Sequence, residues 1–233
     1  TIEMMKGEGI DVSGLTVTSE QASGVALITT VPSGENSIIV DSGANGLLRP
    51  EDITNAEKLF EDAGIVLMQL ETPIDTLTEA AAMAKKHGAY VVLNPAPAPK
   101  EPLPVELLKN VDLLIPNETE AAYISGVNIA GDEDLPAAMN EIQKLGVKDV
   151  IITVGSRGVC ARIDGEMVTV PAFKVKAIDT TAAGDTFCGA LCVALSNGKP
   201  LVEAIRFGCK ASSISVTRRG AQMSMPRLEE IVM

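Results

Sequence analysis

The chain has 233 residues, 46% of them hydrophobic, which is enough to bury one substantial core, or one core with a small appendage. Its formal net charge of −12, with no cluster of Lys and Arg, disfavours nucleic acids and anionic membranes as partners. It contains neither a run of about 18 uncharged apolar residues nor a basic leader followed by an apolar stretch, so we expect no membrane span and no signal peptide.

Two β-branched segments, residues 24–31 and 36–41, are separated by Pro-Ser-Gly-Glu, which predicts a hairpin with a four-residue loop. Beyond it, short apolar runs alternate with segments of helical spacing. Strands are predicted at 65–70, 91–93, 112–115 and 150–154, and helices at 51–63, 75–87, 103–110, 118–125 and 134–145. A small hairpin at 159–163 and 167–170 and two helices at 183–196 and 201–216 complete the prediction.

Strands that alternate with helices predict an α/β domain with a largely parallel sheet. Polar or turn residues follow the ends of the predicted strands, at Glu71, Asn94, Asn117 and Gly155. Ligands of open α/β sheets bind beyond the carboxyl ends of the strands. We therefore expect a ligand site at this edge of the sheet.

Two of these strand-end segments have both a structural and a functional interpretation. Gly155-Ser156-Arg157-Gly158 could be a turn between strands, or its glycines could let a ligand lie against the backbone. Asn117 and Glu120 suit a helix start, and they could also hold a Mg²⁺-bound phosphate through water. The chain contains no P-loop motif and no dinucleotide-binding glycine motif after a strand.

The segment from Asp179 to Phe187 carries the clearest chemical signal. Small residues at a helix start let a phosphate approach backbone N–H groups, where the helix dipole favours negative charge. Asp185 gains nothing from a nearby anion, so it is placed to take a proton from a hydroxyl that attacks a phosphate. The alternative is that Asp185 is an ordinary first-turn helix residue and Gly184 a turn residue.

The four cysteines lack metal-ligand spacing, and His87 is the single histidine, so no ordinary zinc site is expected. Cys188 and Cys192 are one helical turn apart on an apolar face and are interpreted as core residues, which fits a reducing, cytoplasmic setting. His87 is interpreted as a residue at the C-terminus of a helix.

Taken in order, these segments resemble the ribokinase-like (phosphofructokinase-B) carbohydrate kinase family, and within it the ribokinases. The matching stretches cover essentially the whole chain: residues 24–28, 34–36, 43–45, 67–71, 94–98, 116–121, 153–158, 179–187 and 216–222. The resemblance implies a three-layer α/β/α, Rossmann-like fold with a mostly parallel sheet and a small β lid. Residues 16–42 would form a partial lid hairpin, and residues 43–233 the kinase domain with its nucleotide site.

The resemblance also implies a reaction, the ATP-dependent phosphorylation of a sugar hydroxyl that converts ribose to ribose 5-phosphate. Asp185 would be the general base and, with Glu71, would contact the sugar. The backbone N–H groups of Ala182, Ala183 and Gly184 would form the anion hole.

The family's cofactors would be ATP, Mg²⁺ and a monovalent cation, usually K⁺. The matching nucleotide-site positions are Asn117, Glu120, Thr153, Gly155, Ser156, Gly158, Gly184 and Cys209. Glu120 would also serve Mg²⁺ through water. The matching positions for the monovalent cation are Asp179, Thr181, Ser215, Arg218, Gly220 and Ser224. For Arg218, a solvated helix end is the alternative interpretation.

The chain departs from the family pattern in three places. Members often have Gly at the position of Ala182, and relatives often place a polar residue near the adenine where this chain has Cys209. The family's earlier segment has no counterpart before Thr1; it carries a sugar-binding Asp, a Gly-Gly-Lys-Gly-Ala-Asn motif, the first strand and two lid strands. We therefore expect the chain to be a piece of a longer protein, with an incomplete lid and sheet, that does not phosphorylate ribose by itself.

Other functions remain open from the sequence. The acceptor could be another sugar or a nucleoside, or the chain could bind nucleotide without turnover. Relatives dimerise through their lids, so a homodimer through the lid is a further expectation.

Overall fold

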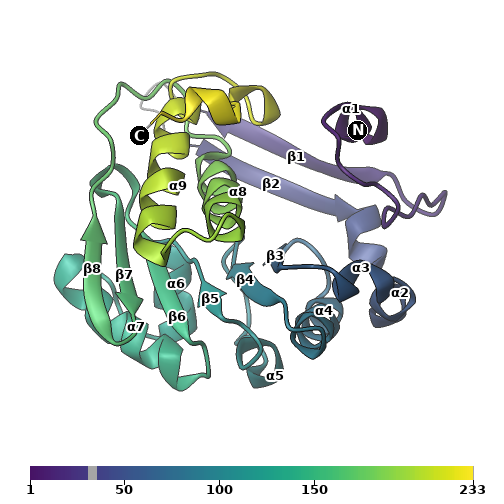
Figure 1. The fold of residues 1–233 in the computed structure, drawn as a ribbon, viewed down its shortest axis with the longest axis horizontal. Coiled ribbons are helices and arrows are strands. Elements are labelled where there is room, and N and C mark those ends of the chain that lie inside the picture. Colours follow the sequence, from purple (N-terminus) through teal and green to yellow (C-terminus); the bar gives the residue numbers. More distant parts are fainter. Residues whose placement is uncertain (31–35, 233) are drawn as a thin grey trace.

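A computed structural model describes residues 1–30 and 36–232. These residues form a six-stranded sheet in the order β3-β4-β5-β6-β7-β8 (Figure 1). Strands β3 (Ile65–Gln69), β4 (Tyr90–Asn94), β5 (Leu113–Leu114) and β6 (Asp149–Thr153) are parallel. Strands β7 (Val159–Ile163) and β8 (Glu166–Val170) add an antiparallel hairpin at one edge. The predicted α/β class and the largely parallel sheet are confirmed.

Helices cover both faces of this sheet because its central strands are apolar on both sides. Val91 and Leu93 of β4 pack against one face, with helices α4 (Ile74–Lys86), α5 (Val105–Leu108), α6 (Glu118–Ser125) and α7 (Leu135–Lys144). Val92 packs on the opposite face, beneath α8 (Ala183–Ser196) and α9 (Leu201–Ser215). Side chains alternate across a strand, so one continuous apolar run supplies both cores. The expected three layers are therefore present (Figure 1).

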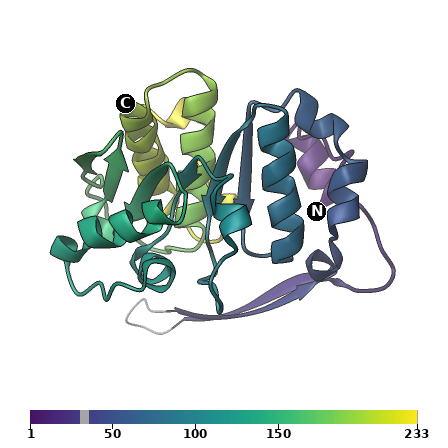
Figure 2. The same ribbon diagram turned by 90° about the horizontal axis from the view of Figure 1, so that it is seen from below.

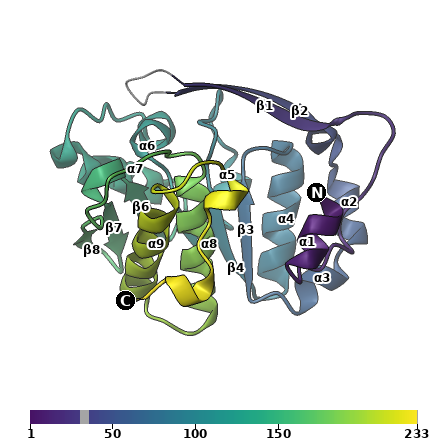
Figure 3. The same cartoon turned by 90° about the horizontal axis from the view of Figure 1, so that it is seen from above.

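The other sheet is the antiparallel pair β1 (Ser23–Thr30) and β2 (Asn36–Gly43), which extends as an arm along one side of the molecule (Figures 2 and 3). The hairpin prediction is confirmed for these strands, and its expected loop lies at residues outside the described ones. The 3₁₀ turn η1 (Ala44–Leu47) joins the arm to the rest of the chain.

The structure differs from the predicted elements in detail. A short helix, α1 (Ile2–Gly7), was not predicted, and the helix expected at 51–63 is divided into α2 (Pro50–Asn55) and α3 (Lys58–Glu61). The Thr54 hydroxyl donates to the Pro50 carbonyl at 3.2 Å, a local bond that competes with helix continuation just before α2 ends. The strand expected at 112–115 is reduced to Leu113 and Leu114.

Within residues 1–30 and 36–232, no strand pairs with the outer edge of β3. Leu67 of β3 is exposed there. Over the same residues, every helix is too short or too polar to cross a lipid bilayer.

Candidate active site

The carboxyl ends of the parallel strands bring several of the expected residues to one edge of the sheet. Gln69 ends β3, Asn94 ends β4 and Thr153 ends β6, and Asn117 forms an isolated parallel bridge with Thr153. Glu71, two residues beyond the end of β3, is exposed. The edge predicted from the order of strands and helices is therefore where the polar residues meet.

Helix α8 begins in a strained turn. Ala182, its N-cap, has φ = 57°, a left-handed conformation that costs a non-glycine residue about 1–2 kcal/mol. This conformation explains in physical terms why glycine suits the position. The Ala182 carbonyl accepts from both the backbone N–H (2.9 Å) and the hydroxyl (2.8 Å) of Thr186.

Of the three N–H groups expected to form an anion hole, that of Ala183 donates to the Thr180 carbonyl at 3.2 Å. This long bond would have to be exchanged before the Ala183 N–H could bind a phosphate oxygen. Ala183 and Gly184 both line the largest cavity described below.

Asp185 lies in the first turn of α8 and is exposed. The Gln69 side-chain amide donates from Nε2 to Asp185 Oδ1 at 2.8 Å. The same nitrogen donates to Asn94 Oδ1 at 3.0 Å. Sequence reasoning missed Gln69, because a single Gln after an apolar run carries no more signal than a strand end.

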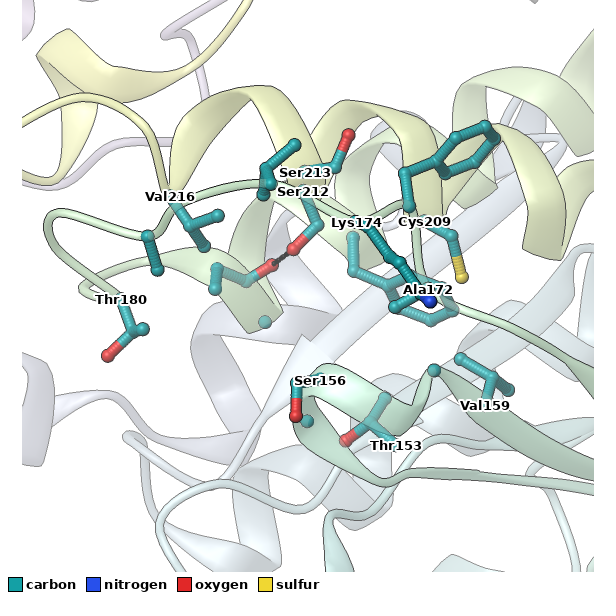
Figure 4. Close-up of a pocket in the computed structure, with 18 residues that line it drawn as sticks. Thr153, Ser156, Val159, Ala172, Lys174, Thr180, Cys209, Ser212, Ser213 and Val216 are labelled. Atoms are coloured by element: carbon teal, nitrogen blue, oxygen red, sulfur yellow. Dashed lines mark hydrogen bonds between the residues drawn. The ribbon is translucent and has the colours of Figure 1, made fainter.

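A cavity of about 420 Å³ lies between the β6–β7 turn, the loop after β8 and the two helices α8 and α9 (Figure 4). Thr180 is at one end of it, and Val159, Lys174 and Cys209 are at the other (Figure 4). Six residues expected at the nucleotide site line it: Thr153, Gly155, Ser156, Gly158, Gly184 and Cys209. Its volume and partly apolar walls suit a nucleotide-sized ligand.

Sequence reasoning missed part of this cavity. Ala172, Phe173 and Lys174 contribute from the segment after β8, which has no regular secondary structure and therefore no periodic pattern to reveal it. Ser212 of α9 also lines the cavity, and its hydroxyl donates to the Ala183 carbonyl at 3.0 Å (Figure 4). Burial raises the pKa of the Cys209 thiol to about 11, so this thiol stays neutral.

Asn117 and Glu120 form a capping box at the start of α6 and do not line the large cavity. Glu120 Oε2 accepts from the Asn117 backbone N–H at 2.8 Å, and Oε1 accepts from Asn117 Nδ2 at 2.9 Å. Burial raises the pKa of the Glu120 carboxyl, and these two hydrogen bonds act in the opposite direction. The structural interpretation of this pair, a helix cap, is thus confirmed.

Asp179, one of the residues expected at the cation site, joins the loop before α8 to the segment after α9. Its Oδ1 accepts from the Thr181 N–H and its Oδ2 from the Gly220 N–H, each at 2.9 Å. The hydrogen bond from the Gly220 N–H contributes most to lowering the pKa of Asp179 to about 2, and the hydrogen bonds from Thr181 contribute next. Ser215 and Ser224, which flank Gly220 along the chain, are buried. Each of their hydroxyls donates to a carbonyl three residues earlier. The Arg218 side chain pairs with Glu230.

The Asp179→Asn variant is expected to be less stable than the parent at pH 6 and nearly equal to it near pH 2. The folded-state pKa lies below the ordinary value of 3.8, so the stabilisation is complete above that value and is lost as pH falls through about 2. An amide also cannot accept both N–H bonds with its two ends. Urea unfolding over a series of pH values measures the difference.

Asp62, an exposed residue that follows α3, provides the control, because Asp62→Asn removes a carboxylate without those two loop contacts. A stability loss in Asp179→Asn that stays constant between about pH 6 and 2 would contradict the assignment of the pKa shift to folding.

Comparison with known proteins agrees with this geometry. The sequence profile of the pfkB family of carbohydrate kinases matches residues 1–228. Over 231 residues the chain is 43% identical to a ribokinase of Staphylococcus aureus, covering 99% of this chain and 75% of that one. It is 44% identical over 223 residues to a ribokinase of Haemophilus influenzae, covering 96% and 72%.

Solved structures show the same likeness. A ribokinase from Thermotoga maritima has a TM-score of 0.85 at 38% identity, over 99% of this chain and 74% of that one. The ribokinase of Arabidopsis thaliana, complexed with ribose and ATP, has a TM-score of 0.84 at 35% identity, over 91% and 69%. The resemblance stated from the motifs is confirmed. The chain belongs to the pfkB family of carbohydrate kinases, which are phosphotransferases.

Proposed function

We propose that this chain belongs to an enzyme that carries out the ATP-dependent phosphorylation of ribose to ribose 5-phosphate. The observation that carries the proposal is the start of α8, where Gly184 lines the large cavity and the next residue, Asp185, lines a smaller one. In this arrangement a nucleotide's phosphates and an acceptor hydroxyl would lie on either side of one helix start. Relatives named ribokinases, at 38–44% identity, support ribose as the acceptor.

In the proposed reaction, Asp185 accepts the proton of the attacking sugar hydroxyl, and the hydroxyl oxygen forms a bond to the γ-phosphorus of ATP. The bond from that phosphorus to the β–γ bridging oxygen breaks, and ADP leaves with the electron pair. N–H groups at Ala182, Ala183 and Gly184 would stabilise the charge on the transferring group. Glu71, exposed beyond β3, would contact the sugar.

The nucleotide would occupy the 420 Å³ cavity, with its base toward Val159 and Cys209 and its phosphates toward Thr180 and Gly184. Thr153, Gly155, Ser156 and Gly158 would form the wall along it. The positive φ of Gly155 (57°) exposes backbone on this wall, with no atom within 4 Å of where a Cβ would stand.

Magnesium would be held through water near Glu120 and Asn117. Over residues 1–30 and 36–232 there is no group of three or more His, Cys, Asp or Glu that could bind a metal directly. Mg²⁺ commonly keeps several waters and binds substrate phosphates, so a single carboxylate and an amide suit it. The ion would neutralise charge on the phosphate oxygens. Each oxygen of the Glu120 carboxylate already accepts one N–H hydrogen bond, so the carboxylate would contact the ion through water rather than directly.

The monovalent cation would bind beside the loops that Asp179 joins. The expected positions are Asp179, Thr181, Ser215, Arg218, Gly220 and Ser224, several of them through backbone carbonyls. Carbonyl and carboxylate oxygens are hard donors that suit K⁺, and the low pKa of Asp179 keeps its charge at neutral pH. Turnover is expected to rise several-fold when K⁺ replaces a tetraalkylammonium salt at equal ionic strength. Equal turnover in the two salts would remove this part of the proposal.

We further propose that residues 16–42 act as a lid separate from the kinase domain, residues 43–233. Leu27 and Ile39 face each other across the hairpin, as do Ala26 and Val40, so both faces carry exposed apolar side chains. Such exposed apolar surface favours a partner, and a second copy of the chain through this lid is the proposed one. A sedimentation coefficient that stays at the value of a monomer at high protein concentration would count against this dimer.

The four free cysteines suit a reducing compartment, and we propose a cytoplasmic location.

The deciding experiment is an assay of ADP release from purified protein with ATP, Mg²⁺ and K⁺, run with ribose, 2-deoxyribose, fructose and adenosine. A deoxyribokinase of Salmonella typhi is 33% identical over 230 residues, which makes 2-deoxyribose the most informative competitor. The highest kcat/KM is expected with ribose. A clear preference for another acceptor would change the substrate, and nucleotide binding by the whole enzyme without release of ADP with any acceptor would refute the kinase proposal.

A further inference from the structure

The side chain of Gln69 connects the start of α8 to the centre of the sheet. It is half-buried at the end of β3, and it bonds to Asp185, which lies 116 residues further along the chain. The sequence motifs assign it no role. Its two contacts, with Asp185 and with Asn94, nevertheless place it directly beside the residue proposed as the base.

The direction of these hydrogen bonds follows from a group whose chemistry is fixed. The Ile115 carbonyl can only accept, and Asn94 Nδ2 donates to it at 2.7 Å. The opposite end of the Asn94 amide, Oδ1, must therefore face Gln69 as an acceptor. Gln69 has to present its NH₂ group to that oxygen, and the second hydrogen of the same group points to Asp185 Oδ1.

These hydrogen bonds form a relay from the Ile115 carbonyl through Asn94 and Gln69 to Asp185, and the relay is anchored in the sheet. Asn94 is buried, with 9% of its surface exposed, and its bond to Ile115 joins the end of β4 to the residue that follows β5. A buried amide with satisfied bonds does not rotate freely, because an exchange of its ends would leave polar atoms unpaired. The orientation of the Gln69 amide is thus set by the backbone of the sheet.

The remaining residues around Asp185 offer no competing contact. The cavity of about 200 Å³ in front of it is lined by Leu67, Met68 and Cys188, together with Gln69 and Asp185. Burial raises the pKa of the Cys188 thiol above its usual range, so this group stays neutral. Among the described residues, Gln69 is the side chain that hydrogen-bonds to Asp185.

We propose that Gln69 is the positioning residue of the phosphoryl-transfer site: it holds Asp185 Oδ1, and Asp185 Oδ2 is the oxygen that takes the proton of the acceptor hydroxyl. This proposal rests on the proposed kinase function. A carboxylate fixed through one oxygen presents the other in one direction, which matters because the reacting atoms must approach along a defined line. Gln69 itself neither gains nor loses a proton.

The kinetic test compares Gln69→Leu with Gln69→Glu. Leu removes the donor, and Glu places a carboxylate against Asp185 Oδ1 and Asn94 Oδ1. Since misplacement of a reacting group by about 1 Å costs roughly 10²-fold, kcat is expected to fall about 10–10²-fold for Leu and further for Glu. Gln69 does not line the nucleotide cavity, so the Kd for a non-hydrolysable ATP analogue should stay near that of the parent.

A double-mutant cycle separates positioning from general structural support. If Gln69 acts through Asp185, then Gln69→Leu should lower kcat no further in an Asp185→Asn background. Additive losses in the double variant would overturn the proposal. Gln143→Leu is the matched control, because Gln143 is a half-buried residue of α7 whose amide donates to the Lys148 carbonyl at 2.8 Å.

A second readout does not need catalysis. The side-chain ¹⁵N–¹H₂ signals of Gln69, identified by their loss in Gln69→Leu, report both of its hydrogen bonds. Asp185→Ala removes the acceptor of one Gln69 hydrogen bond and is expected to shift one of the two proton signals strongly, while Glu203→Gln, in the first turn of α9, leaves both in place. Unshifted Gln69 signals in Asp185→Ala would overturn the proposal. If the parent protein phosphorylates no acceptor, the proposed function fails and this spectrum alone decides whether the relay exists.

Discussion

Replacing Asp185 by Asn is expected to lower kcat for sugar phosphorylation by about 10²–10⁴-fold, the usual contribution of a general base. The amide has the same shape, and its oxygen can still accept the hydrogen bond from Gln69, but it cannot take the proton of the attacking hydroxyl. Asp185 is exposed and does not line the nucleotide cavity, so nucleotide binding should be nearly unchanged.

The variant should also remain folded. An exposed first-turn carboxylate contributes about 0.3–1 kcal/mol through the helix dipole. Glu203→Gln removes a comparable first-turn carboxylate from α9 and serves as the control. Steady-state kinetics and calorimetric titration with an ATP analogue give the two quantities. A parent-like kcat would refute the base assignment, and a raised KM with unchanged kcat would mean that Asp185 only binds the sugar.

The layered fold could be predicted because its signals are local. The apolar runs at 91–93 and 150–154 are too short and too uniformly apolar for exposed elements, and each follows a segment of helical spacing, at 75–87 and 134–145. Such a run becomes a strand buried on both faces: Val91 and Ile152 belong to the core on one face of the sheet, and Val92 and Ile151 belong to the core on the other. The break between α2 and α3 falls just after Thr54, whose hydroxyl bonds to the Pro50 carbonyl, and carries no comparable signal in the sequence.

The candidate site was predictable only where its residues occupy special backbone positions. Asp185 and Gly184 stand at a helix start, and Gly155 and Gly158 at a turn after a strand, so their types and places carried meaning. Gln69 was not predictable, since its importance comes from a contact with a residue far along the chain. The left-handed conformation of Ala182 was hidden for the opposite reason, because alanine does not indicate a positive φ.

The two glycines of the Gly155-Ser156-Arg157-Gly158 turn are expected to respond very differently to replacement by alanine. Gly158 has φ = 106° and ψ = −124°, and an added Cβ would lie 2.2 Å from the Val170 carbonyl oxygen and 2.5 Å from the Ala172 nitrogen. Both are backbone atoms that cannot rotate aside. Strain and overpacking together should cost Gly158→Ala about 3 kcal/mol or more in the free energy of unfolding.

Gly155→Ala provides the matched comparison within the same turn. Its φ of 57° is strained for alanine by about 1–2 kcal/mol, but nothing lies within 4 Å of the added Cβ. Urea unfolding should therefore separate the two variants, and equal losses of stability would contradict the packing argument. Titration with an ATP analogue then decides between the two interpretations of the turn. If Gly155→Ala weakens nucleotide binding beyond its small loss of stability, this glycine serves the approach of the ligand, whereas Gly158 is required for the chain to pass beside the end of β8.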